Sequence, residues 1–217
     1  MKLILGLAAL AASAGVASAA VTVSQWDLNG AAGDQAFTAG SGVANVTADN
    51  LTRGAGLTAN TGGNSLNSAG WTQQATDYVS LGMTVAGGFG VDLKEFYFGA
   101  RSSNSGPGLM GLYYSGDGFA SPIASFVMPS GSVFINQVVD LSALPVLTGN
   151  VEFRFAQIGN VAANGGSTSA SGTWRITAYF VGGVFDRNLQ FTGDVVPTPG
   201  TFALLGLGGL MAGRRRR

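Results

Sequence analysis

Between positions 21 and 191, clusters of Gly, Asn, Ser and Thr interrupt the chain every few residues. These interruptions constrain the possible folds more than any other feature of the sequence. Glycine supplies 35 of the 217 residues, and helical periodicity does not persist over several turns in this region. The segments between the clusters are short and either alternating or apolar, which is typical of β-strands. Ten strands are predicted, at residues 21–28, 43–51, 77–85, 91–98, 109–114, 123–128, 133–141, 151–158, 173–181 and 184–191.

Alternation along these segments indicates which side chains face a core. In segment 151–158 the apolar residues alternate with Glu152 and Arg154, and in segment 173–181 they alternate with Arg175. Successive side chains of a strand point to opposite faces, so the apolar sets are predicted to be buried. These sets are Val151, Phe153 and Phe155; Trp174, Ile176, Ala178 and Phe180; and Phe96 and Phe98, opposite Tyr97.

Short strands at regular spacing predict an all-β domain, an antiparallel β-sandwich of jelly-roll-like type over residues 20–191. An immunoglobulin-like sandwich is the alternative. Stretches rich in Gly, Ser and Asn at 60–70, 101–108 and 162–172 are predicted loops. Loops at the ends of a sandwich are the usual position for binding.

Composition excludes several function classes. The chain has no Cys and no His, so disulfides, zinc–thiolate sites, cysteine nucleophiles and a histidine base are all ruled out. Without Lys2 and the four terminal arginines, six basic groups remain against eleven acidic ones, a net charge of about −5. Such a surface does not suit nucleic acid, which requires clustered cations.

The N-terminal segment has the layout of a secretory signal peptide. Lys2 precedes a continuous apolar run, and small residues follow at Ala17 and Ala19. We predict a signal helix over residues 1–19, with cleavage after Ala19 or, as second choice, after Ala20. A buried N-terminal helix is the alternative, although the stretch has no polar face.

The C-terminal segment, residues 192–217, predicts a linker followed by a membrane-associated tail. An apolar stretch at 202–213 is expected to form a short hydrophobic helix, and it precedes a block of four arginines, Arg214, Arg215, Arg216 and Arg217. The stretch is shorter than the ~20 residues of a full span, but the arginines suit the cytoplasmic boundary of a bilayer. A packed C-terminal helix is the alternative.

The same tail resembles the PEP-CTERM sorting signal of exported bacterial proteins. The resemblance covers residues 195–217 and rests on a proline motif, the apolar run and the arginines. The family usually has Pro-Glu-Pro, and Thr198 departs from it at the middle position. The motif consists of Val196, Pro197, Thr198, Pro199 and Gly200.

This resemblance implies a fate and partners for the chain. A membrane-embedded exosortase-like enzyme would recognise the proline motif, cleave near it and release the body to the envelope or the extracellular space. The tail would anchor the chain to the membrane until then. The resemblance also implies a place in the extracellular matrix or biofilm, with exopolysaccharide as a possible partner.

Candidate ligand sites in the body are few. Calcium needs only oxygen ligands, and Asp27, Asn29 and Asp34 form the best candidate set, although turns use the same residues. No other cofactor is expected. Exposed aromatic rings could stack on sugars, and the candidates are Trp71, Tyr97, Tyr113, Tyr114 and Tyr179.

Catalysis is not expected. The chain has only two glutamates, Glu95 and Glu152, and each is predicted to form an ion pair, with Lys94 and Arg154 respectively. The sequence therefore predicts an exported envelope or extracellular-matrix protein of structural or adhesive role. A carbohydrate-binding module is the first alternative, and a glycan-active enzyme with a carboxylate site is the second.

Overall fold

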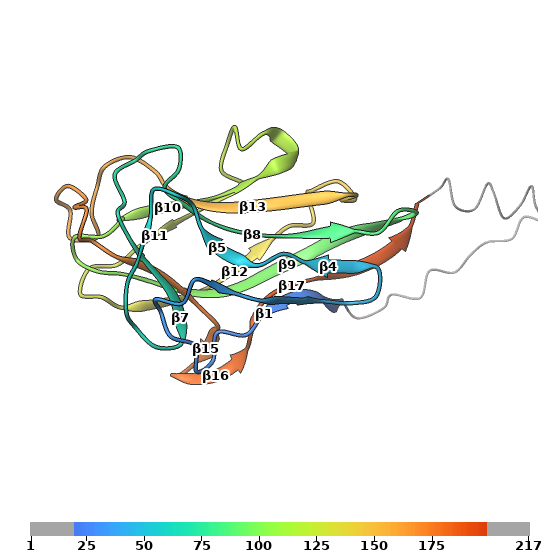
Figure 1. Cartoon of the computed structure of the whole chain (residues 1–217), viewed down its shortest axis with the longest axis horizontal. Helices are drawn as coiled ribbons and strands as arrows, with labels where there is room; N and C mark the ends of the chain where they lie inside the picture. The colour runs from blue at the N-terminus through green and yellow to red at the C-terminus, as the bar shows by residue number, and fades with distance from the viewer. Residues whose placement is uncertain (1–19, 199–217) are drawn as a thin grey trace, which may run out of the picture.

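The computed structural model describes residues 20–198 and contains two large antiparallel sheets (Figure 1). The first sheet has the order β3-β1-β17-β9-β14-β7-β6, with β12 on the other edge of β9. Its strands are β1 (Val21–Trp26), β3 (Gly40–Gly42), β6 (Thr58–Ala59), β7 (Ser65–Ala69), β9 (Phe89–Ser102), β12 (Phe134–Asp140), β14 (Trp174–Thr177) and β17 (Leu189–Pro197).

The second sheet has the order β11-β10-β13-β8-β5-β2, with β4 also paired to β8. Its strands are β2 (Phe37–Thr38), β4 (Val46–Ala48), β5 (Leu51–Arg53), β8 (Tyr78–Val85), β10 (Leu109–Tyr114), β11 (Ala124–Val127) and β13 (Asn150–Gln157). A separate hairpin consists of β15 (Tyr179–Val181) and β16 (Val184–Arg187), and η1 (Ser115–Asp117) is a single 3-10 turn.

The two sheets pack face to face through aromatic side chains. Phe155 of the second sheet lies 4.9 Å from Phe98 and 5.2 Å from Trp174 of the first, between ring centroids. Phe153 lies 4.8 Å from Phe191 in the same way. The all-β, β-sandwich-like fold is therefore confirmed. Eight of the nine core residues predicted from alternation are also confirmed as buried, all except Phe180.

Phe180 was predicted to be core, and this prediction is wrong. The expected strand 173–181 stops at Thr177 and resumes at Tyr179 as part of a hairpin. The two halves pair with different neighbours, β14 with β9 and β7, and β15 with β16. The break at Ala178 ends the alternation, and Phe180 becomes half-buried on the outer side of the first sheet.

Two further boundaries differ from the expected ones. Residues 60–70 were predicted to be a loop, but they contain β7, whose five residues are all buried. The expected end of the domain at residue 191 falls inside β17, which pairs with β1 as far as Gly193 and with β9 as far as Pro197. Thr198 extends this contact, because its backbone N–H donates to the carbonyl of Gly88 at 3.0 Å.

The predictions for the chain ends fall mostly outside the described residues. The signal helix with Ala17 and Ala19 lies outside them, as do the C-terminal helix, Pro199, Gly200 and the four terminal arginines. Ala20 is the first described residue and is exposed. Within residues 20–198, no helix has the length and apolar character needed to cross a bilayer.

Candidate functional site

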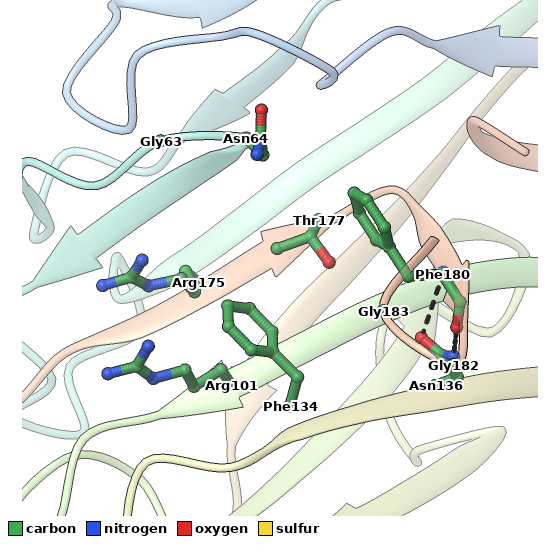
Figure 2. A pocket seen from close by; sticks show the side chains of 10 residues that line it. All are labelled: Gly63, Asn64, Arg101, Phe134, Asn136, Arg175, Thr177, Phe180, Gly182 and Gly183. Atoms are coloured by element: carbon green, nitrogen blue, oxygen red, sulfur yellow. Dashed lines mark hydrogen bonds between the residues drawn. The ribbon is translucent and has the colours of Figure 1, made fainter. Parts of the chain in front are cut away.

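A groove of about 630 Å³ lies on the outer face of the first sheet (Figure 2). Its floor consists of two rows of side chains that cross β12, β9 and β14 in register: Phe134, Arg101 and Arg175 in one, and Asn136, Gly99 and Thr177 in the other. We call it the arginine groove. It is lined by Gly63, Asn64, Arg101, Phe134, Asn136, Arg175, Thr177, Phe180, Gly182 and Gly183.

Gly99 lies in the middle of this floor, where neighbouring atoms leave no room for a side chain. A Cβ at this position would lie 2.3 Å from the hydroxyl oxygen of Thr177 and 2.6 Å from the carbonyl oxygen of Ala178. Real Cβ atoms essentially never approach so closely. This position therefore requires glycine.

Arg101 and Arg175 are direct cross-strand partners on β9 and β14, and both are half-buried. Figure 2 shows their guanidinium groups extending toward the same end of the groove. Burial, and after it the charge of Arg101, lowers the pKa of Arg175 from its ordinary value. The Arg175 guanidinium stays charged at neutral pH, since guanidinium does not deprotonate in proteins.

The other four cations of the described region have partners. Lys94, Arg154 and Arg187 form ion pairs with Asp92, Glu152 and Asp186 at 2.7, 2.7 and 2.5 Å. The guanidinium of Arg53 donates to the backbone carbonyls of Gln35, Gly33 and Asn67. Within residues 20–198, the side chains of Arg101 and Arg175 form neither a hydrogen bond nor an ion pair. The guanidinium carbon of Arg101 lies 5.2 Å from the centroid of the Phe134 ring.

The hairpin β15–β16 forms one wall of the arginine groove. The side-chain amide of Asn136 donates to the carbonyl of Phe180 and accepts from the N–H of the same residue, which fixes the hairpin to β12. Tyr179 packs edge-on against Tyr97 at 5.6 Å between ring centroids, and the Arg187 guanidinium lies 4.4 Å from the Tyr97 ring. The opposite wall is the 62–64 segment, where Gly62 lies against Arg175: a Cβ there would be 2.7 Å from the guanidinium.

A smaller hollow of about 330 Å³ lies on the outer face of the second sheet. Tyr78, Tyr113, Phe119 and Arg154 line it, together with Gln74, Ala75, Asp77, Gly118 and Ala156. Arg154 lies between two rings, 4.2 Å from the centroid of Tyr78 and 3.9 Å from that of Phe119. These two rings are therefore already in contact with a cation, whereas no ring contact is shown for Tyr113.

The predicted sugar platforms fare differently. The prediction that Trp71 is an exposed ring for sugar stacking is wrong. Trp71 is 1% exposed, packs against Trp174 and donates its ring N–H to the Ser68 carbonyl at 2.9 Å. Tyr114 stacks on Phe153 at 5.4 Å, partly within the core. Tyr97 of β9 packs against Tyr179 of the hairpin. Tyr113 lines the smaller hollow.

Two of the three predicted calcium ligands, Asp27 and Asn29, lie together in a turn. The Asp27 carboxylate accepts the backbone N–H of Asn29 at 2.9 Å, as aspartates in turns commonly do. Asp34 is exposed in the following segment. The described part of the chain contains no group of three or more acidic side chains arranged to hold a metal ion.

The two glutamates lie on opposite outer faces of the sandwich, Glu95 on β9 and Glu152 on β13. The predicted ion pair between Glu152 and Arg154 is confirmed. The predicted pair of Glu95 with Lys94 is wrong, because Lys94 binds Asp92 and the Tyr97 hydroxyl donates to Glu95. A glycosidase needs two carboxyl groups within about 10 Å, and these two glutamates do not supply such a pair.

Asp49 is the acidic neighbour of Glu152. Burial, and to a smaller extent the Glu152 charge, raises the pKa of Asp49. Neither residue lines the arginine groove or the smaller hollow.

Comparison with known proteins gives no relative. No protein-family model matches the chain, and neither a curated protein nor a solved structure is significantly similar to it. The residues and their geometry are therefore the basis for its function.

Proposed function

We propose that this chain is an exported, non-catalytic protein of the cell envelope or extracellular matrix, with a structural or adhesive role. The supporting observation is where the first and last strands of the described residues lie in the sequence. The first strand starts at Val21, directly after the expected signal peptide, and the last strand ends at Pro197, inside the expected sorting motif. The sandwich thus begins directly after the expected signal peptide, and its last strand includes Val196 and Pro197, the first two residues of the expected sorting motif.

The placement of the chain ends suits display from a surface. β1 and β17 are antiparallel neighbours, so Val21, opposite Gly193, lies at the same end of the sandwich as Pro197 (Figure 1). The arginine groove lies farther along β9: a strand from Gly90 to Arg101 spans about 36 Å at ~3.3 Å per residue. A chain held by its C-terminal segment would present the groove away from the attachment.

We further propose that the sandwich is a jelly roll. Eight strands support this, with the order β1-β17-β9-β12 in one sheet and β8-β13-β10-β11 in the other. Numbered along the chain, these orders are 1-8-3-6 and 2-7-4-5, as expected when one long hairpin of paired strands is rolled into two Greek keys. An immunoglobulin-like sandwich has a different order of strands in its two sheets.

The proposed export predicts two cleavages. Intact-mass measurement on the protein isolated from its host should give a main species that lacks residues 1–19 or 1–20 and ends between residues 197 and 200. The measurement compares the envelope fraction with the medium. A chain that has lost its leader but still ends at Arg217 would contradict sorting, and a chain with an intact leader would contradict export.

A second candidate function is sugar binding at the smaller hollow. It is favoured by Tyr113, which lines this hollow without a ring partner among the described contacts. If the site binds a neutral oligosaccharide, replacing Tyr113 with alanine should weaken binding roughly two- to tenfold, since one aromatic contact contributes about 0.5–1.5 kcal/mol. Glycan-array signals of the wild type and Y113A would test this, with the exposed Phe37→Ala as the matched control. Equal signals from all three chains would exclude the hollow as a sugar site.

A further inference from the structure

We propose that the arginine groove binds an acidic group carried on a sugar ring, and thus an acidic polysaccharide, with Arg101 and Arg175 as the clamp. The inference deepens the proposed extracellular role and rests on it for the kind of partner.

The two arginines are unpaired although acceptors are abundant. The central region carries eleven acidic groups against six basic ones, and the other four cations are satisfied by carboxylates or backbone carbonyls. The two left over are not scattered on the surface but are direct partners on adjacent strands. Like charges placed opposite each other in an antiparallel pair are destabilising, so an anion that binds between them removes a cost.

The groove holds the pair ready for such an anion. Arg101 lies against the Phe134 ring, and the guanidinium of Arg175 lies against Gly62. A guanidinium offers parallel N–H donors that match the oxygens of a carboxylate or a sulfate. Because the side chains are already packed, less conformational entropy is lost when the anion binds.

The rest of the lining favours a sugar as the carrier of the acidic group. Phe134 is 50% exposed and offers an apolar surface to a ring. The side-chain oxygen of Asn64 accepts from the Gly30 N–H, and its amide N–H groups can donate to sugar hydroxyls. A few polar groups among apolar ones are typical of small-molecule sites. A nucleic acid is disfavoured, because two free cations on a body of net negative charge do not match a phosphate backbone.

Binding measurements on the full chain test this proposal. The probes are polygalacturonate, which carries carboxylates, dextran sulfate, which carries sulfates, and neutral dextran. We expect one or both acidic polymers to bind and dextran not to bind, and the two acidic arms identify the preferred group. Arg101→Ala and Arg175→Ala should each weaken binding about tenfold or more, as expected for hydrogen bonds to charged groups.

Lys94→Ala is the matched control, because it removes one positive charge from the same strand but from a residue paired with Asp92. It should change the affinity less than twofold. Arg101→Lys and Arg175→Lys keep the positive charge but lose the parallel N–H donors of the guanidinium. They should weaken binding while the melting temperature stays unchanged. Equal binding of dextran, no binding of either acidic polymer, or equal losses for Lys94→Ala and the groove variants would each overturn the inference. Processing of the chain ends is measured separately by intact mass, so a failed binding test leaves the proposed export unaffected.

Discussion

Replacing Phe155 with alanine should lower the free energy of unfolding by about 3–5 kcal/mol, the usual cost of removing a buried phenylalanine ring. Phe155 is fully buried on β13, in the second sheet. Its ring contacts Phe98 and Trp174 of the first sheet and Phe126 of its own. The cavity left by alanine would lie between the two sheets. The surrounding side chains are closely packed and cannot move far enough to fill it.

Urea unfolding followed by tryptophan fluorescence measures this effect. Domains of this size are typically stable by about 5–15 kcal/mol, so the loss is a large part of the total. Phe37→Ala is the matched control, because the same ring is removed from a side chain that is 50% exposed. It should cost less than about 1 kcal/mol. Similar losses for the two variants would mean that the two sheets do not pack through Phe155.

Most long strands could be predicted because alternation and turn residues are local signals. β10 has the predicted bounds, 109–114, and the predicted strand at 77–85 differs from β8 by one residue. The predicted faces hold as well. In β13, Phe153 and Phe155 lie on the opposite face from Arg154, their neighbour in the sequence. Local sequence carries this information because the strand period is fixed at two residues.

β7 could not be predicted, because its burial depends on distant partners. Its sequence, Ser-Leu-Asn-Ser-Ala, looks like a loop, yet every residue is buried. The Asn67 side chain donates to the Thr61 carbonyl at 2.7 Å, and the Asn67 carbonyl accepts from Arg53. Polar groups can be buried when they are hydrogen-bonded, but nothing near Asn67 in the sequence indicates that Arg53 supplies the bond.

The arginine groove was missed for a similar reason. Alternation predicted that Arg175 faces outward, and this is confirmed. Arg101 was expected at the start of a loop, whereas β9 continues to Ser102 and brings Arg101 beside Arg175. The register that joins them is set by long-range strand pairing, and the hairpin wall depends on the break at Ala178, which no turn residue marks. A sequence pattern gives the face of each residue but not its cross-strand neighbour.

The end of the domain provides the second prediction of large effect. A chain that stops at Phe191, the boundary expected from the sequence, should fail to show a cooperative unfolding transition. It would lose the last six residues of β17, all of which pair with β9, while Thr192 and Gly193 also pair with β1. Each backbone hydrogen bond lost costs about 0.5–1.5 kcal/mol, and buried donors and acceptors of β9 would be left without partners. The sum is comparable with the whole stability of a domain.

Circular dichroism during urea titration distinguishes this chain from one that stops at Thr198. The longer chain keeps all of β17, including the bond from the Thr198 N–H to Gly88. It should unfold cooperatively, because it keeps every pair between β17 and β9. A cooperative transition in the chain ending at Phe191 would mean that residues 192–197 are a detachable linker. The same comparison bears on processing: a sorting cut within residues 192–196 would remove part of the pairing between β17 and β9, so a product that remains folded should end at or beyond Pro197.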